Sequence, residues 1–180
     1  TTVRHRFAHF TDLHFKGDTG YLRKVCETIN GLNPDFVCFT GDFIEEAPYL
    51  KPALEGLGAI RAPLYAIPGN HDWWSGASFT PIATQLAARG GAWLQNSQRL
   101  IADGRINLMG LDRLPATVRT VPGAFNLLLI HYPVWARQLG DLRADLVLAG
   151  HSLGGLTAVQ LSRDADFTAR YDVQGVFTAG

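Results

Sequence analysis

Residues 64–72 read Leu-Tyr-Ala-Ile-Pro-Gly-Asn-His-Asp, an apolar run that leads directly into a turn and three polar side chains. The apolar part has the length and composition of a buried strand. The same order recurs after predicted strands at 7–11, 36–40, 125–130 and 146–149, which are followed by Asp12-Leu13-His14, Gly41-Asp42, His131 and Gly150-His151-Ser152. Ligands of α/β folds bind at the carboxyl ends of strands. The sequence therefore predicts one site built from these five strand ends.

Helical segments separate the predicted strands of the first half. Apolar residues recur at helical spacing between Leu22 and Ile29, and Gly31 ends this segment. Thr80-Pro81 begins a second helix, and shorter helices are predicted near 52–57 and 134–139. The second half is richer in strands. This order favours an α/β fold in which two sheets pack together with helices outside, as a single domain over residues 1–180.

Composition excludes several classes of protein. The 180 residues are 47% apolar, which excludes a disordered chain, and 16 basic residues balance 16 acidic ones. Zero formal charge argues against bulk nucleic-acid binding and against a polybasic membrane-surface protein. No apolar run reaches the roughly 18 residues of a membrane span, so no transmembrane segment is expected. Cys26 and Cys38 are predicted to be small buried residues rather than a disulfide scaffold.

The residues at the strand ends favour a metal site. Carboxylates and imidazoles suit divalent ions such as Mn, Fe, Zn or Mg. Asp12 and His14 lie two residues apart, so an extended chain aims both side chains the same way. Asp42 could bridge two ions through its two oxygens. Each motif alone is also typical of a turn, a cap or a hydrogen-bonded core histidine, but the ordered set favours two ions that activate a water beside a phosphoryl group.

This ordered set resembles the signature of the calcineurin-like metallophosphoesterase superfamily over about residues 5–155. The resemblance implies a four-layer αββα sandwich of two mixed sheets and a dinuclear metal centre. It implies that Asp12 and His14 hold the first ion and that Asp42 bridges. The second ion would be held by Asn70, His131 and His151. His71 would contact the phosphate and protonate the leaving oxygen as the catalytic residue, with Asp72 orienting its ring.

One position departs from the family pattern. The family usually ends this signature with Gly-His-x-His, whose second histidine binds the first ion, and here that position is Leu153. Leucine cannot ligate, so the resemblance implies a weakened first site with Asp12, His14 and Asp42 as its remaining protein ligands. A metal-binding scaffold with impaired catalysis is therefore the alternative to a metal-dependent phosphoesterase.

A second motif overlaps the last strand end. Residues 150–154 read Gly-His-Ser-Leu-Gly, which fits the Gly-x-Ser-x-Gly elbow of serine esterases and lipases around Ser152. That mechanism needs a histidine downstream of the serine, and His151 is the last histidine in the chain. A serine esterase is therefore the weaker alternative.

Trp73, Trp74 and Phe79 follow the Asn70-His71-Asp72 segment and could form an apolar wall for a substrate, with ordinary packing under a loop as the alternative. Arg113 could grip a phosphate, with a plain surface arginine as the alternative. The compact spacing resembles bacterial envelope phosphodiesterases, which implies a small phosphoester substrate, nucleotide- or lipid-linked. It also implies a cytoplasmic location or one peripheral to the bacterial inner membrane. Relatives commonly continue beyond position 180 with more strands, so a shortened C-terminal end and a homo-oligomer that covers an exposed sheet edge are compatible expectations.

Overall fold

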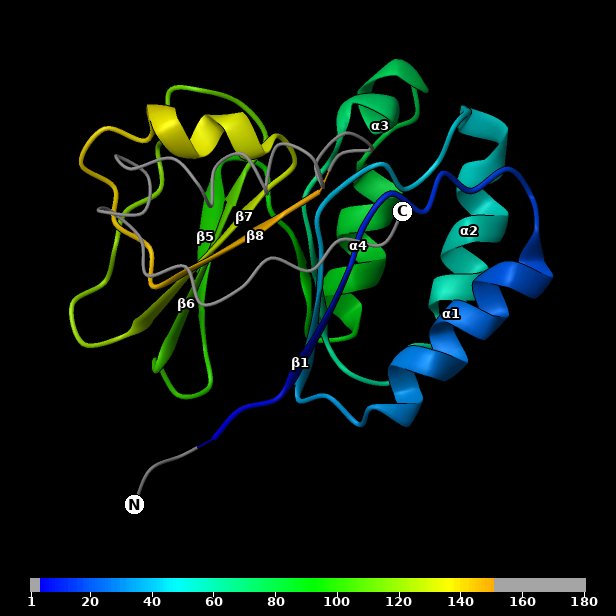
Figure 1. The fold of residues 1–180 in the computed structure, drawn as a ribbon. Coiled ribbons are helices and arrows are strands. Elements are labelled where there is room, and N and C mark those ends of the chain that lie inside the picture. The colour runs from blue at the N-terminus through cyan, green and yellow to red at the C-terminus, as the bar shows by residue number, and fades with distance from the viewer. Residues whose placement is uncertain (1–3, 151–180) are drawn as a thin grey trace. The chain divides into compact units, whose positions relative to one another are not determined.

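A computed structural model describes residues 4–150 (Figure 1). The chain splits into two compact units, Thr1–Trp93 and Leu94–Gly180. The first unit contains β1 (Phe7–Phe10), α1 (Thr19–Gly31), β2 (Phe36–Phe39), η1 (Ala47–Tyr49), α2 (Leu50–Leu57), β3 (Leu64–Ala66), α3 (Asn70–Trp74), α4 (Thr80–Ala88) and β4 (Ala92–Trp93). The described part of the second unit contains β5 (Ser97–Ile101), β6 (Ile106–Leu111), β7 (Phe125–Ile130), η2 (Pro133–Gln138) and β8 (Leu146–Ala149).

The first sheet has the order β1-β2-β3-β4, and all its neighbouring strands are parallel. Its register pairs Phe10 with Phe39 and Phe39 with Ala66, so the carboxyl ends of β1, β2 and β3 lie level. The loops after β1 and β2 continue to pair, because the amide of Asp12 donates to the carbonyl of Gly41 at 3.0 Å. The sheet therefore delivers the first three polar segments to one edge.

Helices α1 and α2 cover this sheet side by side (Figure 1). The side chain of Asp18 caps α1 by accepting the amide of Tyr21 at 2.9 Å. The helix buries Leu22, Cys26 and Ile29, three of the residues that carry its apolar spacing. The two helices approach closely at Gly56, where an added Cβ atom would overlap the Leu22 side chain. Apolar burial against the sheet thus fixes the scaffold under the polar edge.

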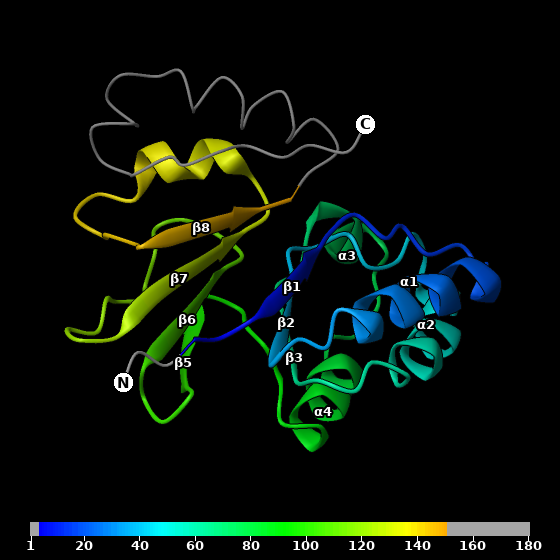
Figure 2. The ribbon, with the colours of Figure 1, turned by 60° about the horizontal axis from the view of Figure 1, so that its bottom comes forward.

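The second sheet has the order β5-β6-β7-β8, visible in sequence order in Figure 2. Strands β5 and β6 are antiparallel, and β6, β7 and β8 are parallel. The register pairs Leu111 with Ile130 and Ile130 with Ala149, so Asp112, His131 and Gly150 follow level strand ends. This sheet has the mixed strand directions that were expected, whereas the described strands of the first sheet are parallel throughout.

The predicted α/β class, two sheets flanked by helices, is confirmed. Cys26 and Cys38 are both buried as free thiols, as predicted. The longest helix that the structure describes, α1, has 13 residues, and none of the described helices is long and apolar enough to cross a membrane. A single domain over residues 1–180 stays a prediction.

Candidate metal centre

The backbone at the first two strand ends adopts an unusual conformation. Asp12, His14 and Asp42 have φ angles of 53°, 44° and 60°, in the left-handed region. Seven non-glycine residues of the described chain have a positive φ, and these three predicted ligands are among them. Such backbone is strained for most L-residues and gathers at functional sites, although aspartate and histidine tolerate it better than most residues do. The chain is therefore not extended at Asp12 and His14, as their two-residue spacing had suggested, and the left-handed backbone instead brings the three side chains together.

The ligand atoms of these residues converge. His14 Nε2 lies 3.6 Å from Asp42 Oδ2 and 3.8 Å from Asp12 Oδ1, too far for hydrogen bonds. One potential ligand atom from each of the three residues lies within 4.8 Å of the others. Atoms that bind one ion at about 2.1 Å stand about 3 to 4 Å apart, so the spacing fits a divalent cation. Two carboxylates and an imidazole are also a suitable donor set for such an ion.

Glu45 contacts the rings of His14 and His71, a role that was not predicted from the sequence. Its Oε1 lies 2.6 Å from His14 Nδ1, and its Oε2 lies 2.9 Å from His71 Nδ1. Partial burial raises the pKa of Glu45, but the hydrogen bonds from His71 and His14 outweigh burial and hold it below its ordinary value. The ionised carboxylate only accepts, so the Nδ1 of His14 and the Nδ1 of His71 each donate a hydrogen bond to it. This arrangement leaves the Nε2 of His14 for a metal ion and the Nε2 of His71 for a proton.

The expectation that Asp72 orients the ring of His71 is wrong. The Asp72 carboxylate is 1% exposed and accepts the backbone amides of Gly69 at 2.8 Å, Asp42 at 2.9 Å, Phe43 at 2.8 Å and Ile44 at 3.2 Å. Burial raises its pKa to about 6 against the lowering effect of the amide donors. Asp72 therefore ties the Asp42 segment to α3, while Glu45 contacts the His71 ring.

Helix α3 brings His71 to the same cluster. Its first residue, Asn70, is 9% exposed, and the amide of His71 donates to Asp42 Oδ1 at 2.9 Å. The rings of His14 and His71 meet edge to face, with centroids 4.6 Å apart. The His71 side chain is 30% exposed, so solvent or a substrate can reach it. The structure thus brings Asp12, His14, Asp42 and His71 together, with Glu45 beside both histidines.

The other predicted ligands lie elsewhere in the chain. His131 follows β7 in the second unit, where it is 1% exposed. His151, with Ser152 and Leu153, lies outside the described residues. The second ion site made from Asn70, His131 and His151 therefore stays a prediction, as do the consequences of Leu153 and the Ser152 elbow.

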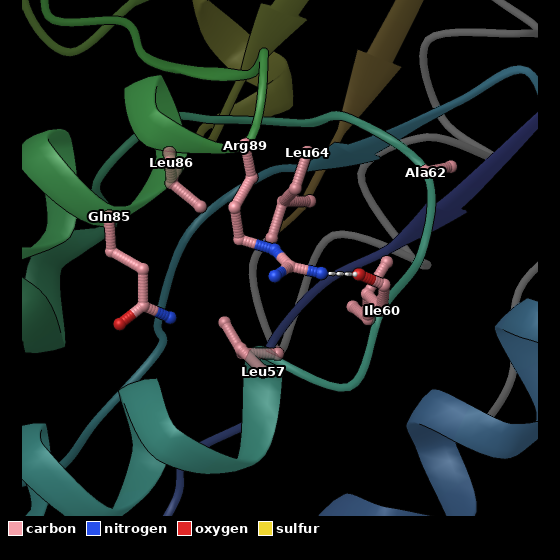
Figure 3. A pocket seen from close by; sticks show the side chains of 7 residues that line it. All are labelled: Leu57, Ile60, Ala62, Leu64, Gln85, Leu86 and Arg89. Atoms are coloured by element: carbon pink, nitrogen blue, oxygen red, sulfur yellow. Dashed lines mark hydrogen bonds between the residues drawn. The ribbon is translucent and has the colours of Figure 1, made fainter.

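Arg113 and a small hollow in the first unit are the two remaining features that bear on the site. Arg113 is 70% exposed in its side chain and lies 4.0 Å from Asp112, so its grip on a phosphate stays a prediction. A small hollow in the first unit is mostly apolar, and the Arg89 guanidinium in it donates to the carbonyl of Ile60 at 2.7 Å (Figure 3). Leu64 lines it from the amino end of β3, whereas the ligand cluster follows carboxyl ends. This hollow is not part of the candidate centre.

Comparison with known proteins agrees with the geometry. The chain is 26% identical over 162 residues to the uncharacterized metallophosphoesterase YkoQ of Bacillus subtilis, covering 82% of this chain and 60% of that one. It is 38% identical over 74 residues to the UDP-2,3-diacylglucosamine pyrophosphatase LpxG of Chlamydia trachomatis, covering 38% and 22%. The crystal structure of TT1561 of Thermus thermophilus superposes with a TM-score of 0.62 at 13% identity, covering 81% of each chain, which supports the fold.

The chain spans 40% to 60% of the lengths of the curated relatives that match most of it. The family model of calcineurin-like phosphoesterases matches residues 5–155. Those residues include every predicted ligand, and the matched family hydrolyses phosphoric esters with metal ions. The chain belongs to the calcineurin-like phosphoesterase family.

Proposed function

We propose that this chain is a metal-dependent phosphoesterase that hydrolyses a phosphodiester or phosphomonoester. The observation that carries the proposal is the convergence of Asp12, His14 and Asp42 within 4.8 Å on strained backbone. Asp12 and His14 would hold a first divalent ion, Asp42 would bridge, and Asn70, His131 and His151 would hold a second ion of Mn, Fe, Zn or Mg. When bound, such ions supply positive charge that activates a water and neutralises phosphoryl oxygens.

The residues of the chain divide the remaining work. In its doubly protonated form, His71 would deliver its Nε2 proton to the leaving oxygen while the bond between that oxygen and phosphorus breaks. The attacking water would bond to phosphorus and release one proton to the solvent. Glu45 supports this role because it accepts a hydrogen bond from the Nδ1–H of His71 and so fixes the orientation of the ring. Asp72 is a positioning residue, because its carboxylate accepts the amide of Asp42 and so holds that backbone in place. The proposal thus assigns proton transfer to one residue and positioning to two.

The substrate is proposed from two sources. LpxG is named for a pyrophosphatase activity on a sugar nucleotide that carries acyl chains. Together with the exposed Trp74 beside His71, this supports a small nucleotide- or lipid-linked phosphoester. A cytoplasmic or inner-membrane-peripheral location and a homo-oligomer stay predictions.

The full chain with added Mn tests the proposal against bis-p-nitrophenyl phosphate and p-nitrophenyl phosphate. We expect turnover in the wild type and a loss of about 100-fold or more in Asp42→Asn. Asp103→Asn serves as the matched control, because Asp103 is exposed and also has a positive φ.

Elemental analysis of the same samples measures the metal content. About two ions per chain would indicate that Leu153 is tolerated, and about one would indicate a weakened first site. A wild type without turnover that gains it in Leu153→His would favour the impaired scaffold. Full activity in Asp42→Asn would refute the proposal.

A further inference from the structure

Trp74 lies exposed beside the proposed proton donor. Its side chain is 73% exposed, the largest exposure among the big apolar residues of the described chain. Its indole centroid stands 5.0 Å from that of the His71 ring at an interplanar angle of 54°. An exposed indole beside a reactive group offers a flat apolar face on which a ligand ring can stack. This indole is therefore a candidate contact for the substrate.

Helical geometry separates the two neighbouring tryptophans. His71 and Trp74 are three residues apart in α3 and so share one face, whereas Trp73 points elsewhere. Trp73 packs edge to face on Phe79 with centroids 4.7 Å apart and is 49% exposed. One tryptophan thus anchors the segment, and the other is presented beside His71.

The backbone after Trp74 is fastened. The Ser75 amide donates to the His71 carbonyl at 2.8 Å, and the Ser75 hydroxyl donates to the Asp72 carbonyl at 2.7 Å. The Ala77 amide in turn donates to the Ser75 hydroxyl at 3.1 Å. A platform held in this way loses little conformational freedom when a ligand stacks on it.

We propose that Trp74 selects substrates whose leaving group carries a flat ring, such as a nucleobase or an aryl group. This inference rests on the proposed function, in which His71 protonates the leaving oxygen. A proton donor must come within about 3 Å of that oxygen, so the group attached to the oxygen lies within reach of an indole next to the imidazole. An exposed indole favours a planar partner, because stacking pairs one flat face with another. An acyl chain would gain only from apolar area.

Binding of two phosphonates that cannot be hydrolysed tests this inference. Benzylphosphonate carries a flat ring, and hexylphosphonate carries a flexible chain of similar apolar size. Their dissociation constants are measured by calorimetry on the Mn-loaded full chain, with the variants Trp74→Ala and Trp74→Phe. Tyr21→Ala is the matched control, because Tyr21 is a 54% exposed aromatic residue on α1.

We expect Trp74→Ala to weaken benzylphosphonate about tenfold and to change hexylphosphonate by less than about twofold. Trp74→Phe should keep most of the affinity, and Tyr21→Ala should keep all of it. Equal losses for both phosphonates would overturn the inference in favour of a lipid chain, and no loss for either would overturn it outright. Because binding is measured without turnover, a chain that binds as expected but hydrolyses nothing contradicts only the proposed function.

Discussion

Replacing Glu45 by glutamine should remove one of its two hydrogen bonds to histidine rings. The carboxylate accepts one N–H from each imidazole, at 2.6 Å from His14 and 2.9 Å from His71. Glutamine offers one acceptor oxygen and an amide group that only donates. One imidazole must therefore lose its partner or exchange its tautomer.

The size of the effect follows from the burial of this pair. A hydrogen bond to a charged group contributes about 1.5 to 3 kcal/mol. The Glu45 side chain is 20% exposed, so the lower value of about 1.5 kcal/mol applies, which corresponds to about tenfold. A loss at His14 lowers Mn affinity about tenfold, and a loss at His71 lowers kcat by a similar factor.

Mn titration and steady-state kinetics read the two effects separately. A double-mutant cycle combines Glu45→Gln with His71→Ala. It isolates the effect of Glu45→Gln that acts through His71, because that effect disappears when the His71 ring is absent. Glu46→Gln is the control, since Glu46 is the exposed neighbour and makes no side-chain cap. If Glu45→Gln changes both Mn affinity and kcat by less than about twofold, the assigned positioning role is refuted.

Three further predictions concern the fold and the first metal site. Gly91→Ala places a Cβ atom against the carbonyl oxygen of Leu64 on β3. We therefore expect the free energy of unfolding, measured in urea, to fall by about 2 to 4 kcal/mol. Gly31→Ala is the control and should not lower it, because Gly31 lies in a helix with open space around the added Cβ. Burial raises the pKa of Cys38 to about 12 and that of Cys26 above its ordinary value. Neither thiol should therefore react with Ellman's reagent at about pH 8 until the chain is unfolded. Rapid labelling of the native chain would contradict the burial of these thiols. Leu153→His should raise Mn affinity by about tenfold or more in equilibrium dialysis, and unchanged affinity would show that position 153 does not serve the first ion.

Local signals were sufficient for much of the fold. The apolar runs predicted the strands β2, β3, β7 and β8 to within about two residues. Buried parallel strands such as β2 and β3 read as continuous apolar segments, and the partly buried β8 does so as well. Helix α1 follows its spacing because one stripe of side chains is buried. Helix α3 was not predicted, since five polar and aromatic residues after a turn carry no helical periodicity.

The site was harder to predict where contacts join distant segments. Asp72 stands next to His71 in sequence, which suggested a contact, but successive residues of a helix point about 100° apart and its carboxylate meets the Asp42 segment instead. Glu45 could have been suspected from its place three residues after Asp42, yet only the folded chain shows that it reaches two histidines. Strand ends predict where ligands gather, and tertiary packing decides which groups hold them.

The left-handed backbone at Asp12, His14 and Asp42 has an evolutionary consequence. Glycine would adopt this conformation with less strain, by about 1 kcal/mol at each position. A lineage that no longer needed the cations would gain robustness by drifting to glycine there. A descendant with glycines at these three positions should therefore be more stable and catalytically inactive. The residue types at positions 12, 14 and 42 would then distinguish active members of the lineage from inactive ones.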